Sequence, residues 1–159
     1  MIIIRCETGD EVQVEGDTLV GARLSARNLH RAFLNGTDLR RADLARADLR
    51  ASWIEGADMS GADLAGARLP VCHAAQAKFV GANLAGALMQ SGDFKGADFT
   101  RANLRGASVG HARFAGAVLV GADMRSIDLL EADLSGASAD ASTSWPDRFD
   151  PVARGVVLR

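Results

Sequence analysis

Large apolar residues return at every fifth position over most of this chain. Reading every fifth residue from Leu19 to Leu134 gives 24 positions, and all but Ala74 carry a large apolar side chain. Two residues before the centres the chain prefers alanine, which occupies 18 of the 24 positions spaced five apart from 22 to 137. The six exceptions are Arg27, Thr37, Ser52, Cys72, Gly92 and Ile127. Aspartate or asparagine often directly precedes the centre, and glycine often follows it by two.

A period of five excludes the ordinary secondary-structure elements. On an α-helix, five residues advance by a net angle of about 140°, so the apolar residues would wind around every face of an alanine-rich helix. On a flat strand, an odd step alternates between the two faces. A core needs all the centres on one side. The chain must therefore turn once in each unit and coil around a narrow axis, with the centre and the small residue two before it pointing inward.

The clearest copies of the unit resemble a known family. Gly56-Ala57-Asp58-Met59-Ser60 and Gly61-Ala62-Asp63-Leu64-Ala65 are similar to the A-(D/N)-L-x-x unit of pentapeptide-repeat proteins, and the match runs from Ala32 to Ala137 without a break in register. The resemblance implies an all-β fold, a right-handed quadrilateral β-helix with four units, or 20 residues, in each coil. The 24 units would then form a solenoid of about six coils.

Both ends of such a solenoid need caps, because each coil pairs only with its neighbours. We expect an N-terminal cap at 1–18, in which Ile2-Ile3-Ile4, Val12 and Val14 form short extended pieces. The repeats occupy 19–138. Arg27 falls on an inward position and predicts a distorted first coil. Residues 139–159 are expected to form a C-terminal cap and dimerisation segment.

The C-terminal segment carries its own resemblance. Ser144-Trp145-Pro146-Asp147-Arg148-Phe149-Asp150-Pro151 looks like the W-P-x-x-F-D-P tail that follows the repeats in many family members. Trp145 and Phe149 are predicted to plug the last coil. The apolar end, made of Val156, Val157 and Leu158, is a candidate contact with a second subunit, so a homodimer through the C-terminal end is expected.

We find no pattern of residues that predicts catalysis, a cofactor or a metal site. The repeat accounts for the recurring aspartates, which should point outward and hydrogen-bond the turn. These are Asp38, Asp43, Asp48, Asp58, Asp63, Asp98 and Asp123. His30, His73 and His111 should occupy separate places, and Cys72 replaces an inward alanine. A narrow, filled solenoid also leaves no cavity for a substrate, so we expect no enzyme activity.

The apolar start of the chain is too short for a signal peptide, and no apolar run is long enough to span a membrane. A cytoplasmic protein without membrane contact is therefore expected.

Charge is segregated along the chain. Residues 21–50 carry seven basic and three acidic side chains, and 121–150 carry two basic and seven acidic ones. The basic band consists of Arg23, Arg27, Arg31, Arg40, Arg41, Arg46 and Arg50. The acidic end consists of Asp123, Asp128, Glu131, Asp133, Asp140, Asp147 and Asp150, of which the first four are candidate interaction residues. With 20 residues per coil, Phe33, Trp53 and His73 would stack as an exposed aromatic ladder, a second candidate interaction site.

The resemblance also implies a partner. Some family members bind type II topoisomerases, DNA gyrase or topoisomerase IV, as rods that resemble DNA in shape and charge. The acidic end fits this hypothesis, whereas the formal net charge of −2 and the basic band do not. The alternative is a scaffold that binds another protein through the aromatic ladder. Direct binding of nucleic acid is disfavoured, because the arginines should spread over several faces.

Overall fold

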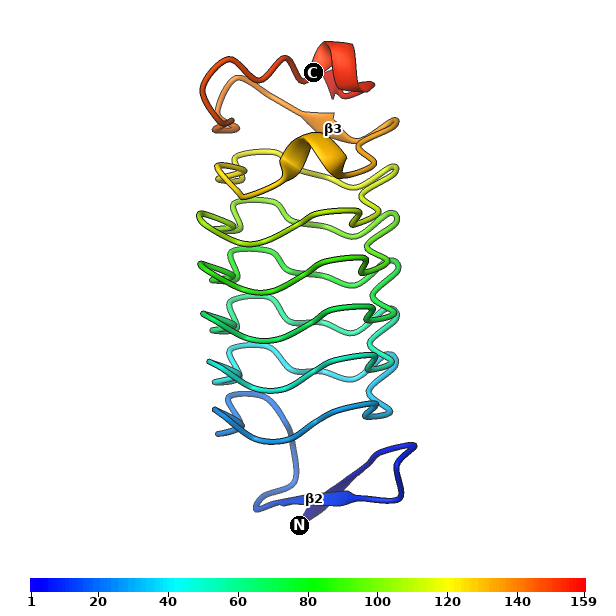
Figure 1. Ribbon diagram of the computed structural model, residues 1–159. Helices are drawn as coiled ribbons and strands as arrows, with labels where there is room; N and C mark the ends of the chain where they lie inside the picture. Colours follow the sequence, from blue (N-terminus) through cyan, green and yellow to red (C-terminus); the bar gives the residue numbers. More distant parts are fainter.

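A computed structural model describes all residues, 1–159, as a straight rod of stacked coils with the two termini at opposite ends (Figure 1). Parallel β-bridges join residues 20 apart, as in the series Arg23 to Asp43 to Asp63. Because each unit has five residues, four units complete one coil. The residues just before the centres therefore fall into four outward columns that run along the rod.

Backbone hydrogen bonds between coils hold the rod together. The Leu44 N–H donates to the Asp63 carbonyl of the next coil at 2.7 Å, and the Asp43 N–H donates to the Ala22 carbonyl of the previous coil at 2.9 Å. Each turn is closed locally, as where the Ala47 N–H donates to Leu44 at 3.0 Å. The chain thus satisfies its polar backbone along the rod axis, as the strands of a sheet do.

The corner residue two after the centre adopts a left-handed conformation in every unit from Leu19 to Leu119 and again after Leu134. Glycine fits there without strain, as Gly61 does at φ 67°. Val71 occupies the same kind of position at φ 56° and is the one β-branched residue with a positive φ. This conformation is costly for a branched side chain.

The centres and the alanines fill the interior completely. Four phenylalanine rings lie in its C-terminal half, where Phe79 stacks on Phe99 with centroids 4.8 Å apart and Phe94 stacks on Phe114 at 5.3 Å. All four side chains are fully buried. The interior position beside Phe94 is Gly92, where an added Cβ would come within 2.5 Å of the ring. The packing is therefore dense enough to select individual residues.

Ser52 is the one buried serine at an interior alanine position, and its hydroxyl has no hydrogen-bond partner. We expect Ser52→Ala to raise the free energy of unfolding by about 1 kcal/mol, since it removes an unsatisfied buried hydroxyl. Urea unfolding measures this change. Ser25→Ala, at an exposed corner, should leave stability unchanged, and a destabilised Ser52→Ala variant would contradict the prediction.

The N-terminal segment is a hairpin below the first coil (Figure 1). Strand β1 (Ile2–Arg5) pairs antiparallel with β2 (Glu11–Val14). Ile4, Val12 and Val14 are buried against the core. The short extended pieces expected from the sequence are therefore present.

Two positions differ from the sequence-based expectations. Arg27 is exposed and not inward: its guanidinium donates to the Gln13 carbonyl at 3.4 Å, and Leu29 remains fully buried in a regular coil. Ile127 is 52% exposed, because it takes the outward position and pairs with Ser108, 19 residues away. Asp128 then adopts a left-handed conformation at φ 61°. The register is therefore interrupted at this point, contrary to the continuous repeat that the sequence predicts.

The C-terminal end combines short elements over the last coil. The 3-10 helix η1 (Leu129–Glu131) precedes β3 (Ser138–Ala139), and η2 (Val152–Arg154) precedes β4 (Val157–Leu158). Strands β3 and β4 pair in parallel. Trp145 and Phe149 stack with centroids 5.3 Å apart and pack against the core.

Candidate interaction surfaces

The outward aspartates and asparagines are occupied in closing turns. Asp58 Oδ1 accepts the Ser60 N–H at 3.0 Å, and Asp98 Oδ1 accepts the Thr100 N–H at 2.9 Å. The same bond to the residue two further on recurs in most units that carry Asp or Asn. The prediction that these carboxylates serve the turns is confirmed.

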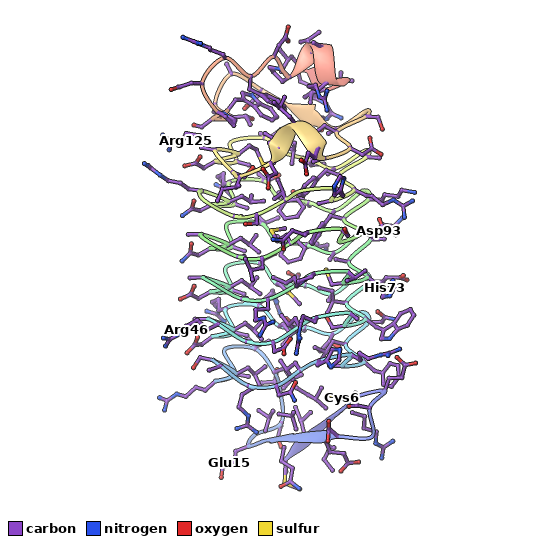
Figure 2. The ribbon with its side chains drawn as sticks, viewed as in Figure 1. Cys6, Glu15, Arg46, His73, Asp93 and Arg125 are labelled. Atoms are coloured by element: carbon purple, nitrogen blue, oxygen red, sulfur yellow. The ribbon has the colours of Figure 1, made fainter.

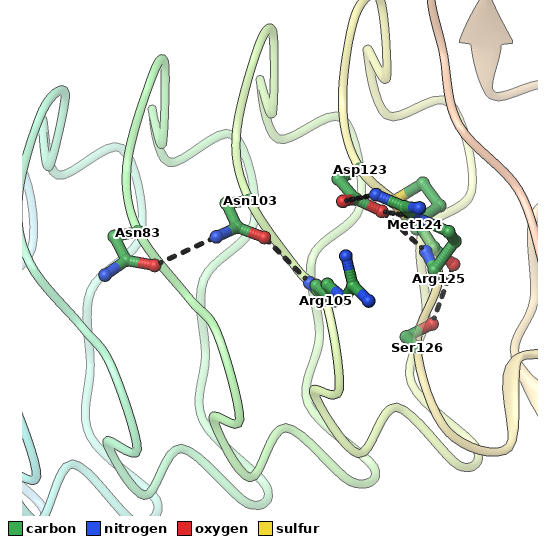
Figure 3. A network of polar contacts seen from close by, with 7 residues as sticks. All are labelled: Asn83, Asn103, Arg105, Asp123, Met124, Arg125 and Ser126. Carbon is green, nitrogen blue, oxygen red and sulfur yellow. Dashed lines mark hydrogen bonds and ion pairs between the residues drawn. The ribbon is translucent and has the colours of Figure 1, made fainter.

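One column of the rod forms a ladder of linked polar side chains. Asn83 Nδ2 donates to Asp63 Oδ1 at 3.1 Å, and Asn103 Nδ2 donates to Asn83 Oδ1 at 3.3 Å. In Figure 3 the linked side chains end at Asn103, whose Oδ1 accepts the Arg105 N–H at 3.0 Å, and Asp123, the next residue in the column, is bound by the Arg125 guanidinium through both carboxylate oxygens. The polar groups of this face are largely satisfied within the chain.

The three aromatic residues of the predicted ladder do lie in one column. Parallel bridges join Phe33 to Trp53 and Trp53 to His73. The Trp53 and His73 rings stack with centroids 4.1 Å apart and an interplanar angle of 9°, and Phe33 is 52% exposed. The Trp53 indole N–H is covered and has no hydrogen-bond partner.

From His73 toward the C-terminus, the same column carries charged side chains instead of aromatic ones. His73 and Asp93 project from the same side of the rod (Figure 2). Asp93 lies 3.5 Å from the Arg113 guanidinium, and Asp133 follows Arg113 in the column. The aromatic surface is therefore confined to the N-terminal half of this face.

The four acidic candidates do not form a single patch. Asp123 and Asp133 lie in different columns, whereas Asp128 and Glu131 lie together over Gly110. Glu131 Oε2 is 3.5 Å from His111 Nε2. A hydrogen bond from Arg125 holds the pKa of Asp123 below its ordinary value, and one from Ser135 does the same for the pKa of Asp133.

The basic band is also divided. Arg31, Arg40 and Arg50 pair with carboxylates at 2.6 to 2.7 Å. Their partners are Glu7, Asp38 and Asp48, in that order. Arg23 lies on an outward column, and Arg41 and Arg46 lie at the two corners that adjoin this column. None of the three forms an ion pair. Three of the seven arginines of the basic band are thus engaged in local ion pairs.

These ion pairs predict a loss of stability in acid. The pKa of Asp38 is lowered by the Arg40 hydrogen bond, as that of Asp123 is by Arg125. A carboxylate whose pKa is lower in the folded state than in the unfolded state stabilises the fold. This contribution is complete above the unfolded pKa of about 3.9 and is lost as the pH falls from there through the folded-state pKa. The urea midpoint should therefore drop between about pH 5 and pH 2. In an Asp38→Asn, Asp123→Asn double variant the drop should be smaller, and an equal drop would contradict this cause.

Hollows occur at both ends of the rod. One of about 470 Å³ lies between η1 and residues 146–149 and is lined by Asp128, Glu131, Leu130 and Phe149, among others. Leu130 is 66% exposed there. The sequence does not reveal this hollow, because it depends on the interrupted register at Ile127. Its only signal is that Ile127 replaces an inward alanine.

The three apolar residues at the C-terminus have different environments. Val156 is buried within its own chain, whereas Val157 and Leu158 are each about half exposed, at 54% and 51%. Only the last two remain available to a second subunit. No helix in the structure has the length and apolarity needed to cross a membrane.

Comparison with known proteins agrees with this architecture. The family model for pentapeptide repeats matches in eight copies over residues 19–52, 42–70, 72–106 and 107–142. No curated protein matches the chain. Among solved structures, the chain is similar to alr5209, a pentapeptide repeat protein from Nostoc Pcc 7120, with 30% identity over 77% of this chain and 84% of that chain and a TM-score of 0.49.

Two further solved structures are similar. HetL, a pentapeptide repeat protein involved in heterocyst differentiation regulation in Nostoc sp. strain PCC 7120, is 29% identical over 86% of this chain and 72% of its own, with a TM-score of 0.43. QnrB1, a plasmid-mediated fluoroquinolone resistance protein, is 21% identical over 89% of this chain and 84% of its own, with a TM-score of 0.50. The repeats, the 20-residue coil and the family match together show that this chain belongs to the pentapeptide-repeat family and forms a right-handed β-helix.

Proposed function

We propose that this protein acts by binding a protein partner along the outside of the rod, and that the partner is a type II topoisomerase, DNA gyrase or topoisomerase IV. The observation that carries the proposal is the filled interior: every centre from Leu24 to Leu134 is buried, so chemical groups are presented only on the outer surface. A straight rod with an acidic end suits an electropositive DNA-binding channel.

Two features support a topoisomerase as the partner. QnrB1, which is named for fluoroquinolone resistance, shares the fold over most of both chains. Residues 121–150, at the C-terminal end, carry seven acidic and two basic side chains. Occupation of the enzyme's DNA site would inhibit the enzyme or protect it from its inhibitors. The proposal keeps the prediction of a cytoplasmic protein, because gyrase acts on the chromosome.

A supercoiling titration tests this function. Purified protein is added to gyrase, with and without a quinolone, and supercoiled product is measured. Inhibition, or protection from the drug, is expected. A double variant, Asp128→Lys with Glu131→Lys, should lose the effect, and Glu55→Lys at an exposed mid-rod corner should retain it. Unchanged supercoiling in both arms would refute topoisomerase binding.

The aromatic column supports a second candidate, a scaffold for another protein. The stacked pair of Trp53 and His73 offers a rigid aromatic surface of the type enriched at interfaces. Proteins captured from an extract by the wild-type chain and by a folded Trp53→Ala variant would be compared. Loss of a partner in the variant is expected under this candidate, and an identical set of partners would count against it.

The exposed strand β4 supports an end-to-end homodimer. Val157 and Leu158 present apolar side chains at the last coil, where nothing else covers them. Leu158→Asp should abolish this contact, which is expected to shorten the particle measured by small-angle X-ray scattering. An assembly of unchanged length in this variant would exclude the end contact.

A further inference from the structure

The exposed apolar residues of the rod body lie along one edge. The large apolar side chains exposed between 19 and 138 are Phe33, Val71, Ile127 and Leu130. Val71 and Leu130 lie at the same corner three coils apart, because they follow the centres Leu69 and Leu129 of one column. Phe33 and Ile127 belong to the two outward columns on either side of this corner. We call this corner and its two columns the apolar edge.

The other two columns differ in composition. One consists of Arg23, Asp43, Asp63, Asn83, Asn103 and Asp123, and the other of Asp38, Asp58, Lys78, Asp98, Val118 and Ser138. Neither contains an exposed large apolar residue. A random scatter of surface apolar residues does not produce such a one-sided arrangement, whereas an interaction surface does.

Backbone strain at Val71 supports a role for this edge. Val71 is 56% exposed, so its side chain contributes little to the core. It adopts φ 56° at a corner where glycine is unstrained. Folding alone gives no reason for a branched apolar residue here. Its neighbour two residues on is His73, which belongs to the aromatic stack.

Charge reverses along the apolar edge. Its N-terminal half carries three arginines and two carboxylates, namely Arg31, Arg50, Arg68, Glu7 and Asp48. Its C-terminal half carries one arginine and four carboxylates, namely Arg113, Asp93, Asp128, Glu131 and Asp133. Arg68 is exposed and has no ion pair in its own chain. One half of the edge therefore carries net positive charge and the other net negative charge, with Phe33 at the first end, Val71 near the middle, and Ile127 and Leu130 at the second end.

We propose that the apolar edge binds the same edge of a second copy of this chain, with the two rods side by side and antiparallel. A twofold axis across the rods places the basic half of each edge against the acidic half of the other. The end of each edge that carries Phe33 then lies against the end of the other edge that carries Ile127 and Leu130. The contact would extend over about five coils, or roughly 24 Å at the usual strand spacing. A parallel arrangement would place like charges together and is disfavoured.

Complementary charge reversals test this arrangement. All proteins carry Leu158→Asp, which removes the end-to-end contact proposed above and makes the two contacts distinguishable. Arg68→Glu leaves a net negative charge on both halves of the edge, and Asp128→Lys with Glu131→Lys leaves a net positive charge on both. Each of these two variants should weaken dimerisation about tenfold or more in analytical ultracentrifugation. Lys78→Glu, at the same height on a column outside the edge, is the matched control and should have no effect.

Recovery of the dimer is the decisive result. An equimolar mixture of the Arg68→Glu protein and the Asp128→Lys, Glu131→Lys protein should form a heterodimer, because each negative half then meets a positive one. A variant that carries all three substitutions in one chain should dimerise as the parent does. A monomeric Leu158→Asp parent, or charge reversals that leave its dimer intact, would overturn the proposal. Circular dichroism of each protein verifies that the β-helix is folded.

Discussion

Replacing Gly92 with alanine is expected to destabilise the rod by about 3 kcal/mol. A Cβ at this position would lie 2.5 Å from Phe94 Cε2, 2.9 Å from Phe94 Cζ and 3.2 Å from the Met89 carbonyl oxygen. Phe94 cannot withdraw, because its ring packs against Phe79, Phe99 and Phe114. The backbone is held as well, since the neighbouring Asp93 N–H donates to the previous coil at 2.9 Å.

The effect comes from crowding and not from backbone strain, because Gly92 does not have a positive φ. Urea unfolding of Gly92→Ala gives the change in free energy. The control is a double variant, Gly92→Ala with Phe94→Leu, which replaces the obstructing ring with a smaller side chain. It should be more stable than the sum of the two single effects predicts. A Gly92→Ala variant within about 0.5 kcal/mol of the parent would contradict the packing that we describe.

Phe99→Ala should cost about 4 kcal/mol. Phe99 contacts all three other rings of the buried cluster: it stacks on Phe79 at 4.8 Å and meets Phe94 and Phe114 edge-on at 5.7 and 5.5 Å. Removal of the ring forfeits these contacts and leaves a cavity that the hydrogen-bonded coils cannot close. Thermal and urea unfolding would both register the loss.

Phe33→Ala is the matched control for this substitution. The same ring is removed, but Phe33 is 52% exposed on the outside of the rod. Its loss should change stability by no more than about 0.5 kcal/mol. If alanine at Phe33 and alanine at Phe99 lowered the free energy of unfolding by similar amounts, burial would not determine the stability of this rod.

The repeat made the interior predictable from sequence. The five-residue spacing identified the buried centres, and the 20-residue coil implied by the family resemblance placed Phe33, Trp53 and His73 in one column, as the structure does. These predictions depend only on periodicity, which a solenoid repeats from coil to coil. The prediction that Arg27 would distort the first coil was wrong, because a long, flexible side chain at an inward position can turn out to solvent.

The candidate surfaces were harder to predict than the interior. Charge along the chain suggested a basic band and an acidic end, but short-range pairs such as Arg40 with Asp38 and Arg125 with Asp123 engage some of these side chains, and the acidic candidates lie apart. The interruption at Ile127 follows from local backbone geometry that the spacing does not encode. The apolar edge becomes visible only when residues 20 apart are placed in columns and their exposure is known.

The 20-residue coil also has a consequence for how such a chain can evolve. Hydrogen bonds join each coil to the ones above and below it, and all four columns advance together. Duplication or loss of the coding sequence for one coil would therefore lengthen or shorten the rod by one coil. Every remaining side chain would stay on its original face. The span of a binding surface can thus be changed by genetic recombination without a new fold having to arise.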